Sequence, residues 1–380
     1  MPLKNFFLFI REKVKKILIF SLIGAAFGSG TILAMKQDFA QKVNLSQPIL
    51  SQAGDFTFGS FSPSGLYLKE INFIKSEQGN FDQQASRDIK KEAVKEEEVL
   101  RAKIGSGPDE LGVVTPEEAN PEGPMSFVVS LGGEVYVLDQ INSRIQVFKS
   151  GKRTRTIPLP GQTFTDIELM PDGRIALMDN LVNEEVFIIN QKGQIEEKIP
   201  LKRVEIPEPG AITGIYCRSE GPWPGLWAEV ENGFILIAGL DGKPNTEMKS
   251  LPGLLTSSGR RFLKIEIAGE KQVKVYRSEE DLKTWNGYQI SFELPLGIVY
   301  GPWEDKEGRI YLAANTFDEK SEANEMVILG PGGKERGRIK LALSSGIHEV
   351  LKPLQVTPDG NIYQLVIESG GVVIRKYSHR

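Results

Sequence analysis

The sequence predicts an all-β fold, a β-propeller of about six blades, preceded by one transmembrane helix and a spacer. Two observations predict the propeller. Short apolar segments separated by turn residues recur through residues 99–380, and their period of about 40 residues is typical of blades built from short strands. A third observation predicts the helix, because residues 17–35 form one uncharged apolar run.

The first element is the membrane segment. Residues 17–35 read ILIFSLIGAAFGSGTILAM, which is about the length that an α-helix needs to cross the hydrocarbon core. Four basic residues come directly before it: Arg11, Lys13, Lys15 and Lys16. The positive-inside rule therefore places residues 1–16 in the cytoplasm. A cleaved signal peptide is the competing interpretation, but the run is longer than an ordinary signal core, which favours an uncleaved anchor.

The second element is a spacer over residues 36–98. Residues 36–60 are polar and rich in Gln, Ser and Gly, as expected of a flexible segment that leaves the bilayer. Alternating aromatic residues and a turn motif predict one hairpin over residues 56–74. Residues 82–98 are dense in charged helix formers, which predicts a solvated helix or stalk.

The third element, residues 99–380, contains the repeats. The clearest unit has a strand at residues 123–129, the turn Gly132-Gly133, a second strand that ends in Asp139, and the strand RIQVF that begins at Arg144. On these residues the chain resembles an NHL repeat, which has a turn glycine, a strand that ends in Asp and a strand of this Arg-Ile-Gln-Val-Phe type. The resemblance implies a propeller, and NHL propellers often serve as interaction platforms.

The other repeats differ in how well they keep this pattern. A second unit covers residues 165–193 with the turn Pro171-Asp172-Gly173, and looser units appear near residues 308–313 and 356–363. Residues 225–240 and 261–294 are rich in strand-forming residues but keep little of the motif. Counting the turns gives about six blades.

The last blade lacks a strand. Its strands are expected near residues 354–356, 362–367 and 372–377, after which the chain stops. Residues 99–104, followed by a Gly-rich loop, look like the outer strand of a repeat displaced to the front. We therefore predict that residues 99–104 pair with the C-terminal blade and close the ring, so that no sheet edge stays open.

Composition excludes several classes of function. The net charge is −4, and the basic residues ahead of the membrane segment leave the part predicted outside more acidic than the whole. An acidic domain lacks the basic field that neutralises phosphates, so nucleic acid is not expected as a partner. Only His348, His379 and one cysteine, Cys217, are present. An imidazole cluster, an intramolecular disulfide and a cysteine-based zinc site are therefore excluded.

Four polar residues near the strand ends of the two clearest units are candidates for binding: Asp139, Asp179, Asn180 and Arg144. Carboxylate and amide oxygens are suited to a divalent cation. The preferred interpretation is that the Asp and Asn side chains accept backbone N–H bonds in their turns, as they do in most turns. Arg144 has a structural interpretation as well, since the NHL pattern places an arginine there.

Metal binding remains open through another set. Lactonase-type propellers, the senescence-marker and gluconolactonase group, resemble this chain in predicted fold and bind one metal ion through Glu, Asn and Asp side chains of separate blades. Such a set can be drawn from Glu168, Asn180, Asn315 and Asp318, but their spacing gives no support for it. No cofactor is predicted, and a divalent cation is the one metal that these carboxylates would suit.

Two tryptophans are further candidates. Trp223 and Trp303 both follow a Gly-Pro pair, and aromatic side chains at loop tips act as interface anchors and sugar-stacking platforms. Packing between blades is the preferred interpretation for both.

The predicted function is a non-enzymatic scaffold, anchored in the inner membrane with its propeller in the periplasm or outside, that binds a protein or a ligand. The partner is expected in the cell envelope, as a protein or a glycan. This function follows from the resemblance in fold. The alternative is a metal-dependent, lactonase-like hydrolase whose site lies at the central channel.

Overall fold

The structure, a computed structural model, describes residues 94–379 apart from residues 118–119, 231–232, 247–249 and 346–347. Within these residues no helix is long and apolar enough to cross a membrane. The membrane segment predicted at residues 17–35 lies outside them, as do the predicted hairpin and most of the predicted charged helix.

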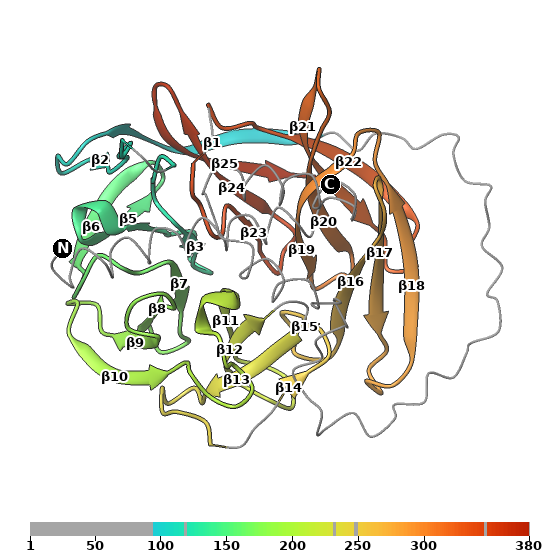
Figure 1. The fold of residues 1–380 in the computed structure, drawn as a ribbon, viewed down its shortest axis with the longest axis horizontal. Coiled ribbons are helices and arrows are strands. Elements are labelled where there is room, and N and C mark those ends of the chain that lie inside the picture. The colour runs from blue at the N-terminus through green and yellow to red at the C-terminus, as the bar shows by residue number, and fades with distance from the viewer. Residues whose placement is uncertain (1–93, 118–119, 231–232, 247–249, 346–347, 380) are drawn as a thin grey trace, which may run out of the picture. The chain divides into compact units, whose positions relative to one another are not determined.

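The described residues form six sheets set in a ring (Figure 1), antiparallel throughout except that β1 and β2 of the last blade pair in parallel. We call them blades 1 to 6, and the predicted all-β six-bladed propeller is confirmed. Blade 1 holds β3 (Phe127–Val129), β4 (Val135–Asp139), β5 (Arg144–Lys149) and β6 (Lys152–Pro158). Blade 2 holds β7 (Asp166–Leu169), β8 (Ile175–Asp179), β9 (Glu185–Ile189) and β10 (Ile195–Pro200). Blade 3 holds β11 (Ile212–Arg218), β12 (Gly225–Val230), β13 (Gly233–Ala238) and β14 (Ser250–Leu251).

The remaining blades follow in chain order, apart from the last. Blade 4 holds β15 (Leu254–Leu255), β16 (Phe262–Gly269), β17 (Gln272–Ser278) and β18 (Trp285–Ser291). Blade 5 holds β19 (Leu296–Glu304), β20 (Ile310–Phe317), β21 (Glu322–Leu329) and β22 (Glu335–Leu341). Blade 6 combines β23 (Leu354–Val356), β24 (Ile362–Glu368) and β25 (Gly371–Ser378) with β1 (Lys95–Ile104) and β2 (Glu110–Leu111). Two short 3-10 helices cover Gln140–Asn142 and Pro209–Ala211.

The sequence of each strand reflects its depth in the blade. The second strands β4 (VYVLD) and β8 (IALMD) are buried at every position, because neighbouring blades cover both faces of the sheet. The outer strand β6 (KRTRTIP) is mostly exposed and buries only Ile157 fully. The turns between first and second strands use glycines such as Gly133 and Gly173, both at positive φ, where a residue without Cβ fits at no steric cost.

The hydrophobic core is divided among the blade interfaces. One apolar cluster joins Ile167 and Ile175 of blade 2 to Leu138 of blade 1, and equivalent clusters lie at each of the other five interfaces. A single twisted sheet cannot bury both of its faces alone, so each blade is stabilised by two neighbours.

The ring closes through the N-terminal strand, as predicted. β1 pairs antiparallel with β25, with Leu100 opposite Ile374 and Ala102 opposite Val372. Leu100 and Ala102 are buried in the cluster between blades 6 and 1. In Figure 1, β1 lies along the outside of β25.

The strand starts earlier than the sequence indicates. β1 begins at Lys95, so the helix or stalk predicted through Glu98 is wrong for its last four residues. The register sets Glu97 opposite Lys376 and Glu98 opposite Arg375. The Glu96 carboxylate forms an ion pair with Arg375 across the two strands. Backbone pairing with β25 and this ion pair therefore override the helix propensity of the run.

A candidate binding site at the centre of the ring

Asp139 lies fully buried at the end of β4. Its carboxylate accepts a hydrogen bond from the Gly112 backbone N–H at 2.8 Å, from Asn142 Nδ2 at 2.9 Å and from Arg144 Nε at 2.7 Å. Arg144 in turn donates to the carbonyl oxygens of Gly107 and Glu110 at 2.9 and 2.7 Å. Asp139 and Arg144 thus tie the loop after β1 to blade 1.

Asp179 and Asn180 have similar internal partners. Asp179 accepts the backbone N–H groups of Val182 and Asn183 at 3.0 and 3.2 Å. Asn180 accepts from Thr165 Oγ1 at 2.7 Å and donates to the Ile212 carbonyl oxygen at 3.2 Å. These contacts organise the β8–β9 turn and the passage to blade 3, and a binding role for the four residues remains a prediction.

The two tryptophans lie in different blades and do not form one platform. Trp223 is half-buried in the β11–β12 turn, with its ring stacked on Phe262 of blade 4 at 6.1 Å between centroids. Trp303 lies within strand β19 and packs against the cluster between blades 5 and 6. The shared Gly-Pro-Trp motif therefore forms a turn at the first position and part of a strand at the second.

The four residues considered for a lactonase-like metal set have separate partners. Asn315 donates to Glu322 and Asn324, both at 2.9 Å, and Asp318 accepts the backbone N–H groups of its own turn. In the part of the chain that the structure describes, no group of three His, Cys, Asp or Glu side chains could hold a metal ion. Only Glu168 belongs to the polar centre described next.

The first strands of the blades, among them β3, β7, β11 and β23, line the inside of the ring (Figure 1). A polar cluster connects residues of β7 and β11 with the segment just before β23. Its middle is Lys352, which lies just before β23. The ammonium group donates to Asp166 Oδ2 at 2.9 Å and to the Ile215 carbonyl oxygen at 3.1 Å. Asp166, on β7, is fully buried and also accepts from Ser126 Oγ at 2.5 Å and from the Ile215 N–H at 2.8 Å. Side chains and backbone of blades 1, 2, 3 and 6 therefore meet on one buried ion pair.

The cluster continues along β7 and β11. Glu168 has a carboxylate oxygen 3.6 Å from Lys352 Nζ, and its side chain is 15% exposed. Lys352 Nζ also lies 4.7 Å from the centre of the Tyr216 ring, and the Arg218 guanidinium lies 5.3 Å from that same centre. Tyr216 is thus contacted by two cations, in the geometry of cation–π interactions.

Burial sets the protonation of this cluster. It raises the pKa of Glu168, although Lys352 and Arg218 act in the opposite direction. It raises the pKa of Glu229 to about 7, and it raises the pKa of the Tyr216 hydroxyl, which donates to Glu229 Oε2 at 3.0 Å. The pKa of the Cys217 thiol rises to about 12. The thiol is therefore neutral near pH 7 and is a poor nucleophile.

Sequence reasoning missed most of this cluster. Of its charged members it considered only Glu168 as a ligand, because Asp166 and Lys352 stand 186 residues apart and Lys352 lies outside the repeated motif. The one available signal is local: Asp166 and Glu168 alternate with apolar residues on a first strand, so both lie on the face opposite Ile167 and Leu169.

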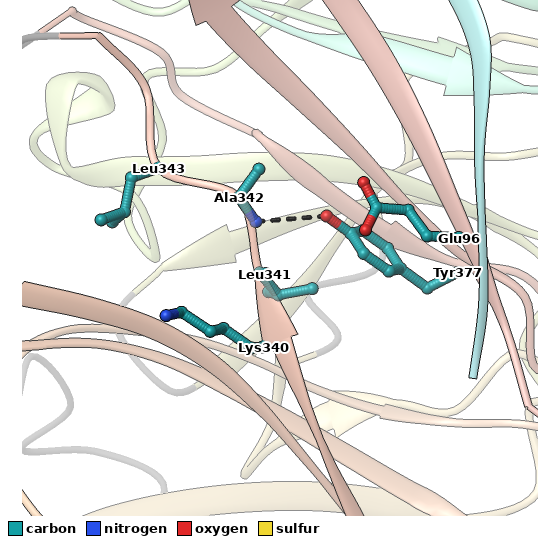
Figure 2. Close-up of a pocket in the computed structure, with 6 residues that line it drawn as sticks. All are labelled: Glu96, Lys340, Leu341, Ala342, Leu343 and Tyr377. Carbon is teal, nitrogen blue, oxygen red and sulfur yellow. Dashed lines mark hydrogen bonds between the residues drawn. The ribbon is translucent and has the colours of Figure 1, made fainter. Parts of the chain in front are cut away.

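An open hollow of about 390 Å³ lies elsewhere, between β22 of blade 5 and β1 of blade 6. Figure 2 shows Glu96 and Tyr377 on one side of it and Lys340 on the other. The Tyr377 hydroxyl accepts the Ala342 N–H at 3.1 Å. This hydrogen bond joins the two blades beneath the hollow, which is separate from the central cluster.

No protein-family model matches the chain, and no curated protein is similar to it in sequence. The solved structures that it resembles include virginiamycin B lyase from Staphylococcus aureus, at 14% identity over 76% of this chain and all of that chain, with a TM-score of 0.40. A protein of unknown function from Bacteroides thetaiotaomicron has 13% identity over 76% of this chain and 77% of that one, with a TM-score of 0.45. A member of the DUF4221 family from Bacteroides vulgatus has 11% identity over 77% of this chain and 99% of its own, with a TM-score of 0.44. The assignment of a six-bladed propeller rests on the sheet topology itself.

Proposed function

We propose that this chain is a non-enzymatic binding propeller, held outside the cytoplasm by residues 17–35, and that its ligand binds at the centre of the ring. The observation that carries this proposal is the convergence of four blades on Lys352 beside a partly exposed Glu168. Ligand sites combine a rigid scaffold with a small number of convergent polar groups, and the centre of this ring has both. The membrane attachment rests on the sequence of the N-terminal segment.

The chemistry of the cluster favours binding over catalysis. Lys352 gives hydrogen bonds to Asp166 and to two backbone carbonyl oxygens, so all three of its donors are used. It is therefore not available as a base or nucleophile. Cys217, the one thiol, is held neutral by burial. What remains for a ligand is charge and hydrogen bonding from Glu168 and Arg218.

The test is ligand-dependent melting of the full chain in detergent. We expect a fraction of a cell-envelope extract to raise the Tm, because a ligand that binds only the native state stabilises it by mass action. Glu168→Gln and Arg218→Gln should abolish the rise. The matched controls are Glu270→Gln and Arg336→Gln, which change exposed side chains on blades 4 and 5. A rise that survives both central substitutions would place the site elsewhere and contradict the proposal.

Divalent cations separate this proposal from the hydrolase alternative. We expect calcium and zinc to leave the Tm unchanged, with or without EDTA. A rise in Tm with either cation that EDTA reverses would overturn the non-enzymatic proposal and favour a metal-dependent hydrolase.

A further inference from the structure

Arg218, at the end of β11, is a cation without a carboxylate partner. Its Nε donates to the Leu255 carbonyl oxygen at 3.0 Å and its Nη1 to the Cys217 carbonyl oxygen at 3.1 Å. Within the described part of the chain, neither nitrogen nor the second terminal nitrogen forms an ion pair. A guanidinium has five N–H donors, so most of the donors of Arg218 remain available.

Glu168 is the complementary group. It lies 3.6 Å from Lys352 Nζ, but the donors of Lys352 are directed at Asp166, Ile167 and Ile215 instead. No other side chain among the described residues donates a hydrogen bond to the Glu168 carboxylate. Lys352, Arg218 and a backbone hydrogen bond from Leu169 favour the charged carboxylate, but its burial outweighs them and raises the pKa of Glu168, so a further donor would stabilise it.

Two aromatic rings hold Arg218 in place. The Tyr216 ring lies under the Arg218 guanidinium, and the Phe234 ring, stacked on Tyr216 at 5.4 Å, lies 5.8 Å from the same guanidinium. The backbone acceptors Leu255 and Cys217 fix the other edge of Arg218. The guanidinium is therefore held in place before any ligand arrives, which lowers the entropic cost of binding.

We propose that the centre of the ring binds a small zwitterion of the α-amino-acid type, with its carboxylate on Arg218 and its ammonium group on Glu168. The planar guanidinium matches a carboxylate with two parallel hydrogen bonds. An ammonium group supplies the donors that Glu168 lacks. A ligand with both groups adds no net charge to a largely buried site, whereas an anion or a cation alone adds one. The inference rests on the proposed function, because it uses the same site.

The experiment titrates the full chain in detergent with free amino acids and measures Tm and heat of binding. Acetate and methylammonium, each carrying one of the two groups, are tested beside them. We expect at least one amino acid to bind, and both single-group compounds to bind at least tenfold more weakly. Arg218→Gln and Glu168→Gln should each weaken binding of the amino acid at least tenfold, while Arg336→Gln and Glu270→Gln leave it unchanged. Arg218→Lys keeps the positive charge but cannot form two parallel hydrogen bonds to a carboxylate. This variant should therefore fold but bind the amino acid more weakly.

The outcomes separate the inference from the proposed function. If no amino acid binds at millimolar concentration, but an envelope extract raises the Tm in an Arg218-dependent manner, the zwitterion is wrong and the central site stands. If neither the amino acids nor the envelope extract bind, both the zwitterion inference and the proposed central site are wrong. If acetate binds as tightly as the amino acids, Glu168 takes no part and the zwitterion proposal is overturned.

Discussion

At the scale of single residues, Lys352 connects parts of the chain that are far apart in sequence. Its side chain is 10% exposed, and its partner Asp166 is fully buried. We predict that Lys352→Met lowers the free energy of unfolding by about 3–5 kcal/mol, because it leaves a buried carboxylate without its cation. Urea unfolding measures the change. Lys340→Met, which removes an exposed lysine on β22, is the control and should be near neutral; a similar loss for both would refute the role of the ion pair.

The pair can be tested further with a double variant. Asp166→Asn combined with Lys352→Met should cost less than the sum of the two single changes, because the second substitution removes a charge that the first has already left unpaired. Additive costs would show that the two side chains stabilise the ring independently.

Glu229 predicts how stability depends on pH. Its pKa in the folded protein is about 7, raised from an ordinary value of 4.5 by burial. Between these values the folded state holds a proton that the unfolded state releases, so stability is full below the ordinary pKa and falls as the pH rises. Each pH unit in this window costs up to about 1.4 kcal/mol. Glu229→Gln should flatten the slope measured by urea unfolding; an unchanged slope would assign the effect to another group.

The residues of the central cluster also show why the sequence reveals little of the site. Asp139 and Arg144 stand in a repeated motif, so their role at strand ends could be inferred from their neighbours. Lys352 stands in a connection between blades, where no period applies. Its partner Asp166 resembles any polar residue on a strand. Lys352 and Asp166 come into contact only when the whole ring closes, and their spacing in the sequence does not predict this contact.

At the scale of elements, β1 decides whether the last blade is complete. We predict that a chain beginning at residue 90 melts like the full chain, and that one beginning at residue 105 unfolds or forms oligomers, because β25 is then an open edge. Thermal melting and light scattering after size exclusion measure both. A truncated chain without β1 that melts unchanged as a monomer would disprove the closure.

A pair of substitutions tests the same strand without removing it. Leu100 is 2% exposed and packs between blades 6 and 1, whereas Ile104 is 42% exposed on the same strand. Leu100→Glu buries an unpaired charge and should cost several kcal/mol, while Ile104→Glu should be near neutral. Equal melting of the two variants would show that β1 contributes no buried face.

The elements were predicted with different success for physical reasons. The strands of blades 1 and 2 are short apolar runs set between turn glycines in a repeated motif, so sequence reasoning located them. For blade 6, the sequence showed that the C-terminal blade lacks a strand, and this led to the prediction that residues 99–104 supply it. The first residues of β1 were assigned to a helix because KEEE has high helix propensity, whereas in the structure they pair with basic residues of β25. Only tertiary contacts decide between these two states.

At the scale of the whole molecule, the remaining prediction tests the proposed membrane attachment through residues 17–35 and the proposed location of the ring outside the cytoplasm. A C-terminal alkaline phosphatase fusion should be active and a fluorescent-protein fusion dark, because the positive-inside rule predicts that the basic residues before residue 17 stay in the cytoplasm. Deleting residues 1–35 is the control and should leave the phosphatase inactive. A fluorescent full-length fusion would reverse the proposed topology.

The place of β1 in blade 6 has a consequence for the order in which the molecule is made. A ribosome completes β1 first and its partner β25 last, so β1 waits through the synthesis of five blades with an exposed edge. Closure joins segments at opposite ends of the described chain, and contacts of such sequence separation form slowly. During that wait, the β1 of one copy can pair with the completed β25 of another. Folding should therefore improve when synthesis is slow and copies are dilute, and crowded expression should give dimers that have exchanged their first strand.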